Sequence, residues 1–113
     1  MERYDLKVFQ GETFLQELVF RNSAGEIIDL TGYTGFSQVR PNPESDELIC
    51  AMECLVDGPQ GKATLLIESM ITGGIAPGCY AYDFAMRSPN GFVRYYIGGK
   101  FSVLPAVTEI QGS

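Results

Sequence analysis

Three stretches in the second half of the chain alternate apolar and polar residues with a period of two, and tight turn signals join them. These stretches cover residues 62–68, 79–87 and 92–103. In the middle one, Tyr80, Tyr82, Phe84 and Met86 share one face of an extended strand. The turn residues 88–91, Ser-Pro-Asn-Gly, supply the preset φ of proline and the positive φ of Asn-Gly that a hairpin needs. This half of the chain therefore predicts antiparallel β-structure.

Strand patterns also occur in the first half, at residues 6–10, 13–21, 26–30, 33–40 and 48–56. Residues 69–74 fit a single helical turn, with Ser69 as N-cap and Gly73 as terminator. The pair Gly98-Gly99 indicates a bulge or kink in the last strand. We predict an all-β fold, a single immunoglobulin-like β-sandwich of about seven to eight antiparallel strands with one short helical turn.

The alternation also predicts the core. Its predicted members are Phe14, Phe20, Met52, Val56, Leu65, Ile67, Tyr80, Tyr82 and Phe84. The longest loop is 40–47, which holds two prolines and three acidic residues. At 113 residues the chain forms one domain. We assign residues 1–105 to the sandwich and 106–113, which follow Pro105, to a C-terminal arm.

The three cysteines are expected to be free thiols. Cys50 and Cys54 lie four residues apart on one predicted strand, about 13 Å at 3.3 Å per residue. A disulfide needs Cα atoms within about 7 Å. The odd count leaves Cys79 over, and all three are read as small core residues or free thiols rather than metal ligands.

Composition argues against several functions. The net charge of −6 opposes binding to a phosphate backbone, and no apolar run is long enough to span a membrane. The N-terminus shows no signal-peptide pattern, so we expect synthesis in the cytoplasm. Because the chain contains no histidine, Ser-His and Cys-His catalysis is excluded within it. We therefore predict no enzyme activity, no catalytic residues, no cofactor and no nucleic-acid or membrane partner.

Other candidate sites are weak. A carboxylate pair could be drawn from Asp29, Glu53, Glu68 and Asp83, but no spacing selects two of them. The acidic loop 44–47 lacks the ligand spacing of an EF-hand, and no metal site is predicted.

Tyrosine side chains suggest one structural and one interface role. Tyr80 follows Pro77-Gly78, where sandwich domains place a tyrosine whose hydroxyl bonds back to the preceding connection. Tyr95 and Tyr96 must occupy opposite faces of their strand. With Arg94 beside it, Tyr96 is a candidate interface residue, because Tyr and Arg are enriched at interface hot spots.

The order of short motifs resembles a family of small phage and prophage β-sandwich proteins, similar to the N-terminal domain of siphophage upper baseplate proteins. The matching residues are 10–14 (Gln-Gly-Glu-Thr-Phe), 29–33 (Asp-Leu-Thr-Gly-Tyr), 38–40, 78–84, 90–93, 99–103 and 107–108. The resemblance implies a virion structural component, most simply a tail or baseplate adaptor between tail core and receptor-binding fibres.

That resemblance also implies partners and a location. The partners would be other tail, baseplate or fibre proteins, bound in several copies per particle through sheet edges and loops. The arm would contribute Val107 and Ile110 to such contacts. The location would be the virion tail, assembled in the host cytoplasm. Alternatives are an immunoglobulin-like recognition module for a host surface glycan or protein, and a capsid-decoration or tail-tube-attached protein.

Overall fold

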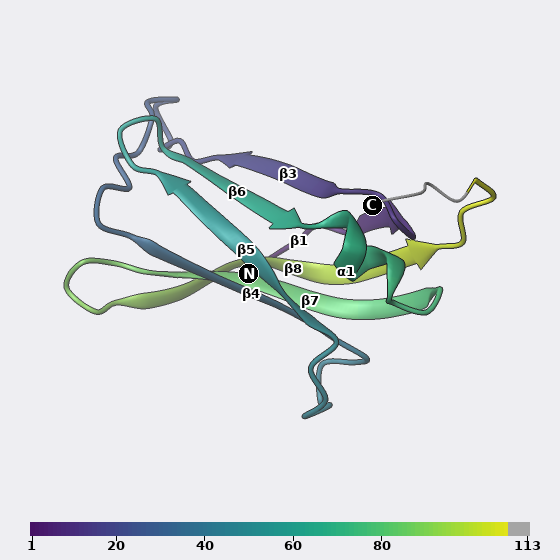
Figure 1. The fold of residues 1–113 in the computed structure, drawn as a ribbon. Helices are drawn as coiled ribbons and strands as arrows, with labels where there is room; N and C mark the ends of the chain where they lie inside the picture. Colours follow the sequence, from purple (N-terminus) through teal and green to yellow (C-terminus); the bar gives the residue numbers. More distant parts are fainter. Residues whose placement is uncertain (109–113) are drawn as a thin grey trace.

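The computed structural model describes residues 1–108, which form two layers of β-strands (Figure 1). The elements are β1 (Glu2–Arg3), β2 (Leu6–Phe9), β3 (Phe14–Val19), β4 (Thr34–Arg40), β5 (Cys50–Asp57), β6 (Lys62–Ile67), α1 (Ser69–Gly73), β7 (Gly78–Arg87) and β8 (Val93–Leu104). The predicted all-β sandwich with one helical turn is confirmed.

A single curled sheet makes both layers. Sheet A contains β1 and β2 beside β8, then β7, β4 and the first residues of β5. Sheet B contains the remainder of β5, then β6 and β3. β5 pairs with β4 through residues 50–52 and with β6 through residues 53–57, so it passes from one layer to the other. In Figure 1, β3, β5 and β6 lie above β4, β7 and β8.

Antiparallel pairing was predicted for all strands, but part of the pairing is parallel. β1 and β2 run parallel to β8, with Leu6 opposite Phe101 and Val8 opposite Val103. The N-terminal segment then turns at Gly11, whose φ is +82°, and continues as β3 in the other layer. Because β2 and β3 belong to different layers, the segment between them connects the two layers at one side of the sandwich. β5 connects the two layers at the other side.

Residues 26–30 form no strand, contrary to prediction. A single bridge joins Arg21 to Ile27, and the amide of Leu30 donates to the carbonyl of Gly58. Leu30 is nevertheless buried, so the segment supplies a core side chain from a loop. Ile27 and Ile28 of the same segment are exposed, so Leu30 is the one apolar side chain that it buries.

Two local predictions also need correction. Glu68 rather than Ser69 occupies the N-cap of α1, and Gly74 rather than Gly73 is the C-cap. The irregularity in β8 lies at Tyr96, because Phe84 pairs with Ile97 whereas Ala85 pairs with Tyr95. Gly99 does adopt a φ of +154°, so the Gly-Gly pair marks an unusual backbone, but the extra residue sits earlier.

The core between the layers contains the predicted residues. Phe14, Met52, Leu65, Ile67, Tyr82 and Phe84 are buried, and Phe20, Val56 and Tyr80 are partly buried against them. Further core members outside the predicted set include Leu6, Val8, Val39 and Phe101. The ring of Phe14 meets that of Phe101 edge-on at 5.3 Å, which joins β3 of sheet B to β8 of sheet A.

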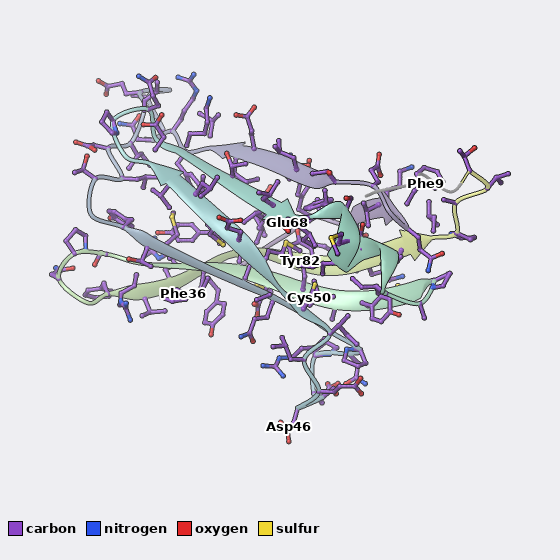
Figure 2. All side chains as sticks on the ribbon, in the orientation of Figure 1. Phe9, Phe36, Asp46, Cys50, Glu68 and Tyr82 are labelled. Atoms are coloured by element: carbon purple, nitrogen blue, oxygen red, sulfur yellow. The ribbon has the colours of Figure 1, made fainter. Side chains whose placement is uncertain are left out.

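Hydrogen bonds hold the N-terminal segment against sheet A between β1 and β2. The amide of Tyr4 donates to the carbonyl of Gly98 at 2.9 Å. The amide of Lys100 donates to the Asp5 carboxylate at 2.9 Å, and the buried Tyr82 hydroxyl donates to the Tyr4 carbonyl. Tyr82 therefore lies between the layers (Figure 2) and also holds the first residues of the chain.

We expect Tyr82→Ala to lower the free energy of unfolding by about 3 to 5 kcal/mol, as truncation of a buried aromatic side chain does. Tyr82→Phe should lose about 1 to 2 kcal/mol, because it leaves the Tyr4 carbonyl without its donor. The matched control is Tyr95→Phe, since Tyr95 is exposed and should tolerate the change. Denaturant unfolding measures all three. A loss below 1 kcal/mol for Tyr82→Ala would contradict the core described above.

The three cysteines are free thiols, as predicted, and differ in exposure. Cys50 is buried, Cys54 is half-buried and Cys79 is exposed. Burial, with a smaller contribution from the Glu53 charge, raises the pKa of the Cys54 thiol to about 11. We expect a thiol reagent to modify Cys79 first in the native protein, and the rate at Cys54 to keep rising towards pH 11. Mass-mapped labelling over a pH series measures this order, and equal rates at the three positions would contradict it.

Candidate interaction surface

The residues predicted to form an interface do not lie together. Tyr96 points into the sandwich, where its ring meets Phe20 edge-on at 5.2 Å and lies 6.3 Å from Phe84. Arg94 is exposed opposite Met86 near the start of β8. Val107 is fully exposed beyond the end of β8, and Ile110 lies outside the described residues. Contacts of Arg94, Val107 and Ile110 with a partner stay a prediction.

The irregularity in β8 explains the error at Tyr96. Strict alternation places Tyr95 on the same face as Ile97 and leaves Tyr96 on the outer face. The extra residue at Tyr96 lets Tyr95 pair with Ala85 on the outer face and keeps Tyr96 against the core. Tyr95 is therefore the exposed tyrosine, and no sequence signal at this position marks the change.

A concentration of positive charge lies on the outer face of sheet A. Strand register gives the facing, because cross-strand partners project to the same side. Tyr82, Phe84 and Phe101 point inward, so their strand neighbours point outward. The outward residues include Arg3, Lys7, Arg40, Arg87 and Lys100, which are five of the eight Lys and Arg residues of the protein. We call this surface the basic face.

Exposed apolar residues lie on the same face. Phe36 is 46% exposed and Tyr95 is 55% exposed, and both flank the buried Ala85 on the middle strand. The guanidinium of Arg87 stacks 5.1 Å from the centre of the Phe36 ring. Phe36 projects from β4 on the side away from sheet B (Figure 2). The basic face thus combines aromatic and cationic side chains, the types enriched at protein interfaces.

The polar half of the basic face contains a depression. An open depression of about 740 Å³ is lined by Arg3, Arg40, Asp83, Tyr95 and Lys100, among others. Arg40 is held by hydrogen bonds to the Gln38 side chain at 2.7 Å and the Asp46 carbonyl at 2.9 Å. Cys79 also lines the depression and gives it a natural labelling site.

Two carboxylates accompany these cations. Arg3 pairs with Asp5 at 3.2 Å. Hydrogen bonds from the Lys100 amide and from Arg3 hold the pKa of Asp5 below its ordinary value. Burial raises the pKa of Asp83, against an opposing effect of the Arg40 charge. Among the outward residues of β1, β2, β4, β7 and β8 and the Asp5 turn, five are cationic and two are carboxylates, in a protein whose net charge is −6.

Acidic residues outnumber cationic ones on the outer face of sheet B. On sheet B, Glu17, Glu53 and Asp57 face outward with Lys62 as the one cation among the residues in the paired strands. Glu17 pairs with Lys62 at 3.3 Å. The two outer faces of the sandwich therefore differ in the sign of their charge.

The carboxylates considered as catalytic candidates do not gather into a site. Asp29 accepts hydrogen bonds from the amide and hydroxyl of Thr31, which lower the pKa of Asp29. Within residues 1–108 no three Cys, Asp or Glu side chains are placed to hold a metal ion. In the same residues no helix is long and apolar enough to cross a membrane.

Comparisons with solved structures give distant likenesses, of which one is named here. No family model matches the chain, and no curated protein matches it. The structure of CopC from Methylosinus trichosporium OB3b is similar over 94% of this chain and 89% of that one, at 17% identity and a TM-score of 0.49. A likeness this distant does not identify a function.

The resemblance to phage baseplate domains is corrected by these comparisons. No family model and no curated relative supports it, and the solved structure named above is that of CopC. The tail-adaptor function, the virion location and the alternatives of a host-surface recognition module, a capsid-decoration protein and a tail-tube-attached protein are withdrawn with it.

The residues that carried the resemblance have turn and packing roles that occur in many β-sandwiches. Gly32 provides a φ of +85° in the turn before β4, and Asp29 caps that turn through Thr31. The hydroxyl of Tyr80 donates to the Ala76 carbonyl at 2.5 Å, which confirms its predicted structural role. Because turn geometry and core packing select these residue types, their order does not identify a family.

We expect Asp83→Asn to stabilise the protein at pH 7. The raised pKa of Asp83 means that the folded state binds its proton more tightly than the unfolded state, so the ionised form opposes folding above that pKa. The gain should shrink as the pH falls through the raised pKa towards the unfolded value of about 3.9.

The matched control is Asp29→Ala, for which the sign reverses. The lowered pKa of Asp29 contributes stability at pH 7 that is lost as the pH falls through its folded pKa. Asp29→Ala should therefore destabilise at pH 7 and matter less in acid. Unfolding curves at pH 7 and near pH 3 separate the two; a stability loss for Asp83→Asn at pH 7 would contradict the assigned environment.

Proposed function

We propose that this protein is a non-catalytic interaction module whose basic face binds an acidic, partly apolar segment of a partner protein. The observation that carries the proposal is the gathering of five of its eight cationic residues on one sheet face in an otherwise acidic protein. Opposite charge on a partner would steer the encounter and fix its orientation. The exposed Phe36 and Tyr95 would supply apolar contact.

A protein partner fits better than a nucleic acid. Phosphate-backbone binding depends on continuous clusters of Lys and Arg. Here Asp83 lies within the depression and Asp5 pairs with Arg3, so a track of phosphates would meet carboxylates. A protein segment can instead place hydrogen-bond donors near Asp83 and carboxylates near Arg40 and Lys100.

A non-catalytic role is supported by the chemistry of the surface. The protein has no histidine to serve as a general base near neutral pH. Among the described residues, the carboxylates on the basic face are Asp5, which is engaged by Arg3 and the Lys100 amide, and Asp83, which stands alone among cations. The exposed thiol of Cys79 has no imidazole to activate it.

We expect a synthetic peptide of alternating Glu and Leu residues to bind the wild-type protein and to slow the labelling of Cys79. Arg40→Glu and Lys100→Glu should each weaken binding by about tenfold or more, because each replaces attraction with repulsion. Binding should also weaken as salt rises. Calorimetric titration and thiol-labelling rates measure both effects.

The control is Arg94→Glu, which makes the same charge change on an exposed residue outside the basic face. Arg94→Glu should bind the peptide like the wild type. Equal weakening by Arg94→Glu would reduce the effect to net charge and contradict a localised site. Tight binding of a single-stranded oligonucleotide in place of the peptide would contradict the proposed partner class.

A further inference from the structure

The edge strand β3 presents unpaired main-chain groups. It pairs with β6 on one side, and among the described residues no other strand pairs with it. The amide of Phe20 donates to the carbonyl of Gly61 on the β6 side at 2.8 Å, which fixes the phase of the ladder. In that phase, Leu15, Glu17 and Val19 point their N–H and C=O groups away from β6, towards the open edge.

This edge carries few of the devices that block strand addition. β3 contains no proline and pairs with β6 through six consecutive residues without a bulge. Its charged residue is Glu17, which is bridged to Lys62 at 3.3 Å. The side-chain amide of Gln16 donates to the Glu17 carbonyl at 3.1 Å and partly covers it. The other edge of the sheet is made by two shorter strands, β1 of two residues and β2 of four.

We propose that β3 pairs with β3 of a second copy in antiparallel orientation, about a two-fold axis at Glu17. This register sets Leu15 opposite Val19 of the second copy, Glu17 opposite Glu17, and Val19 opposite Leu15. Every outward N–H then meets a C=O of the other chain, because all three residues belong to the same phase of the ladder. Two three-stranded sheets would become one sheet of six strands.

The apolar side chains on this edge match each other in that register. Leu15 is 59% exposed and Val19 is 51% exposed, and both lie on the outer face of sheet B. Antiparallel pairing about Glu17 keeps their faces aligned, since the paired residue numbers always differ by an even number. Each apolar residue would therefore pack against an apolar residue of the second copy.

Repulsion between the two Glu17 side chains makes the association weak, and it makes the association strengthen as salt rises. The two Glu17 side chains would face each other across a hydrogen-bonded pair, where Cα atoms lie about 5.5 Å apart. Their repulsion is reduced by the neighbouring Lys62 of each chain. Added salt screens the remaining repulsion, so association should strengthen with salt. The basic face shows the opposite dependence, and this inference does not rest on the function proposed for it.

Sedimentation velocity over a wide range of protein concentrations tests the pairing. We expect a weak monomer–dimer equilibrium that tightens about tenfold or more in Glu17→Gln and also tightens at higher salt. Glu17→Pro should remain folded and monomeric, because the lost N–H points to the open edge and not to β6. Val19→Lys should also remain monomeric and controls for any strain that the proline introduces.

Amide hydrogen exchange gives the second readout. In the dimer, the amides of Leu15, Glu17 and Val19 should become protected in Glu17→Gln at high concentration and stay unprotected at low concentration. A Glu17→Gln protein that sediments as a monomer throughout would overturn the proposal. Dimerisation that leaves those three amides unprotected would overturn it too. If the protein dimerised only after removal of residues 109–113, the β3 edge would be assigned to the protein's own terminus. That result would also contradict the proposal.

Discussion

The alternation of β7 is the constraint on which both the core and the exposed surface depend. β7 pairs along its length with β8 and over seven residues with β4. The inward or outward facing of each β7 residue therefore sets the facing of the residues paired with it. Tyr82 and Phe84 turn inward: the Phe84 ring lies 6.4 Å from Phe20 of the other layer, and Tyr82 packs on Phe101, which meets Phe14 of the other layer. Ala81, Asp83 and Ala85 turn outward, and their small size leaves room for the depression and for Phe36 and Tyr95 beside it. A one-residue shift of this strand would exchange core and surface together.

Much of this arrangement could be predicted from the sequence, because alternation and turn chemistry are local signals. The strands around Leu65, Tyr82 and Phe84 were found from periodicity, and the Tyr80 hydrogen bond was found from its place after Pro77-Gly78. Long-range features carry no comparable signal. The parallel pairing of β2 with β8 depends on which strand the N-terminal segment packs beside, and the local sequence does not encode that choice. The passage of β5 between the layers depends on a bend that no residue type in the strand indicates.

The candidate surface was harder to predict, because it is assembled from five strands, β1, β2, β4, β7 and β8, that come from both ends and the middle of the sequence. Arg3, Arg40 and Lys100 come together only after the sheet order is known. The interface predicted at Tyr96 was misplaced by the extra residue in β8, which returns that ring to the core. The phage resemblance was misleading for a related physical reason, since the residues that carried it perform turn and packing roles that recur in many sandwiches.

The basic face and the β3 edge lie on different layers and would respond in opposite ways to salt, so the protein could use both at once. The most direct test of the basic face is a chemical-shift map of the isotope-labelled protein titrated with the Glu-Leu peptide. We predict that the largest shifts fall on Phe36, Ala85, Tyr95 and Lys100, with Leu15 and Leu55 on sheet B unchanged. Shifts concentrated on sheet B would contradict the assignment of the binding surface.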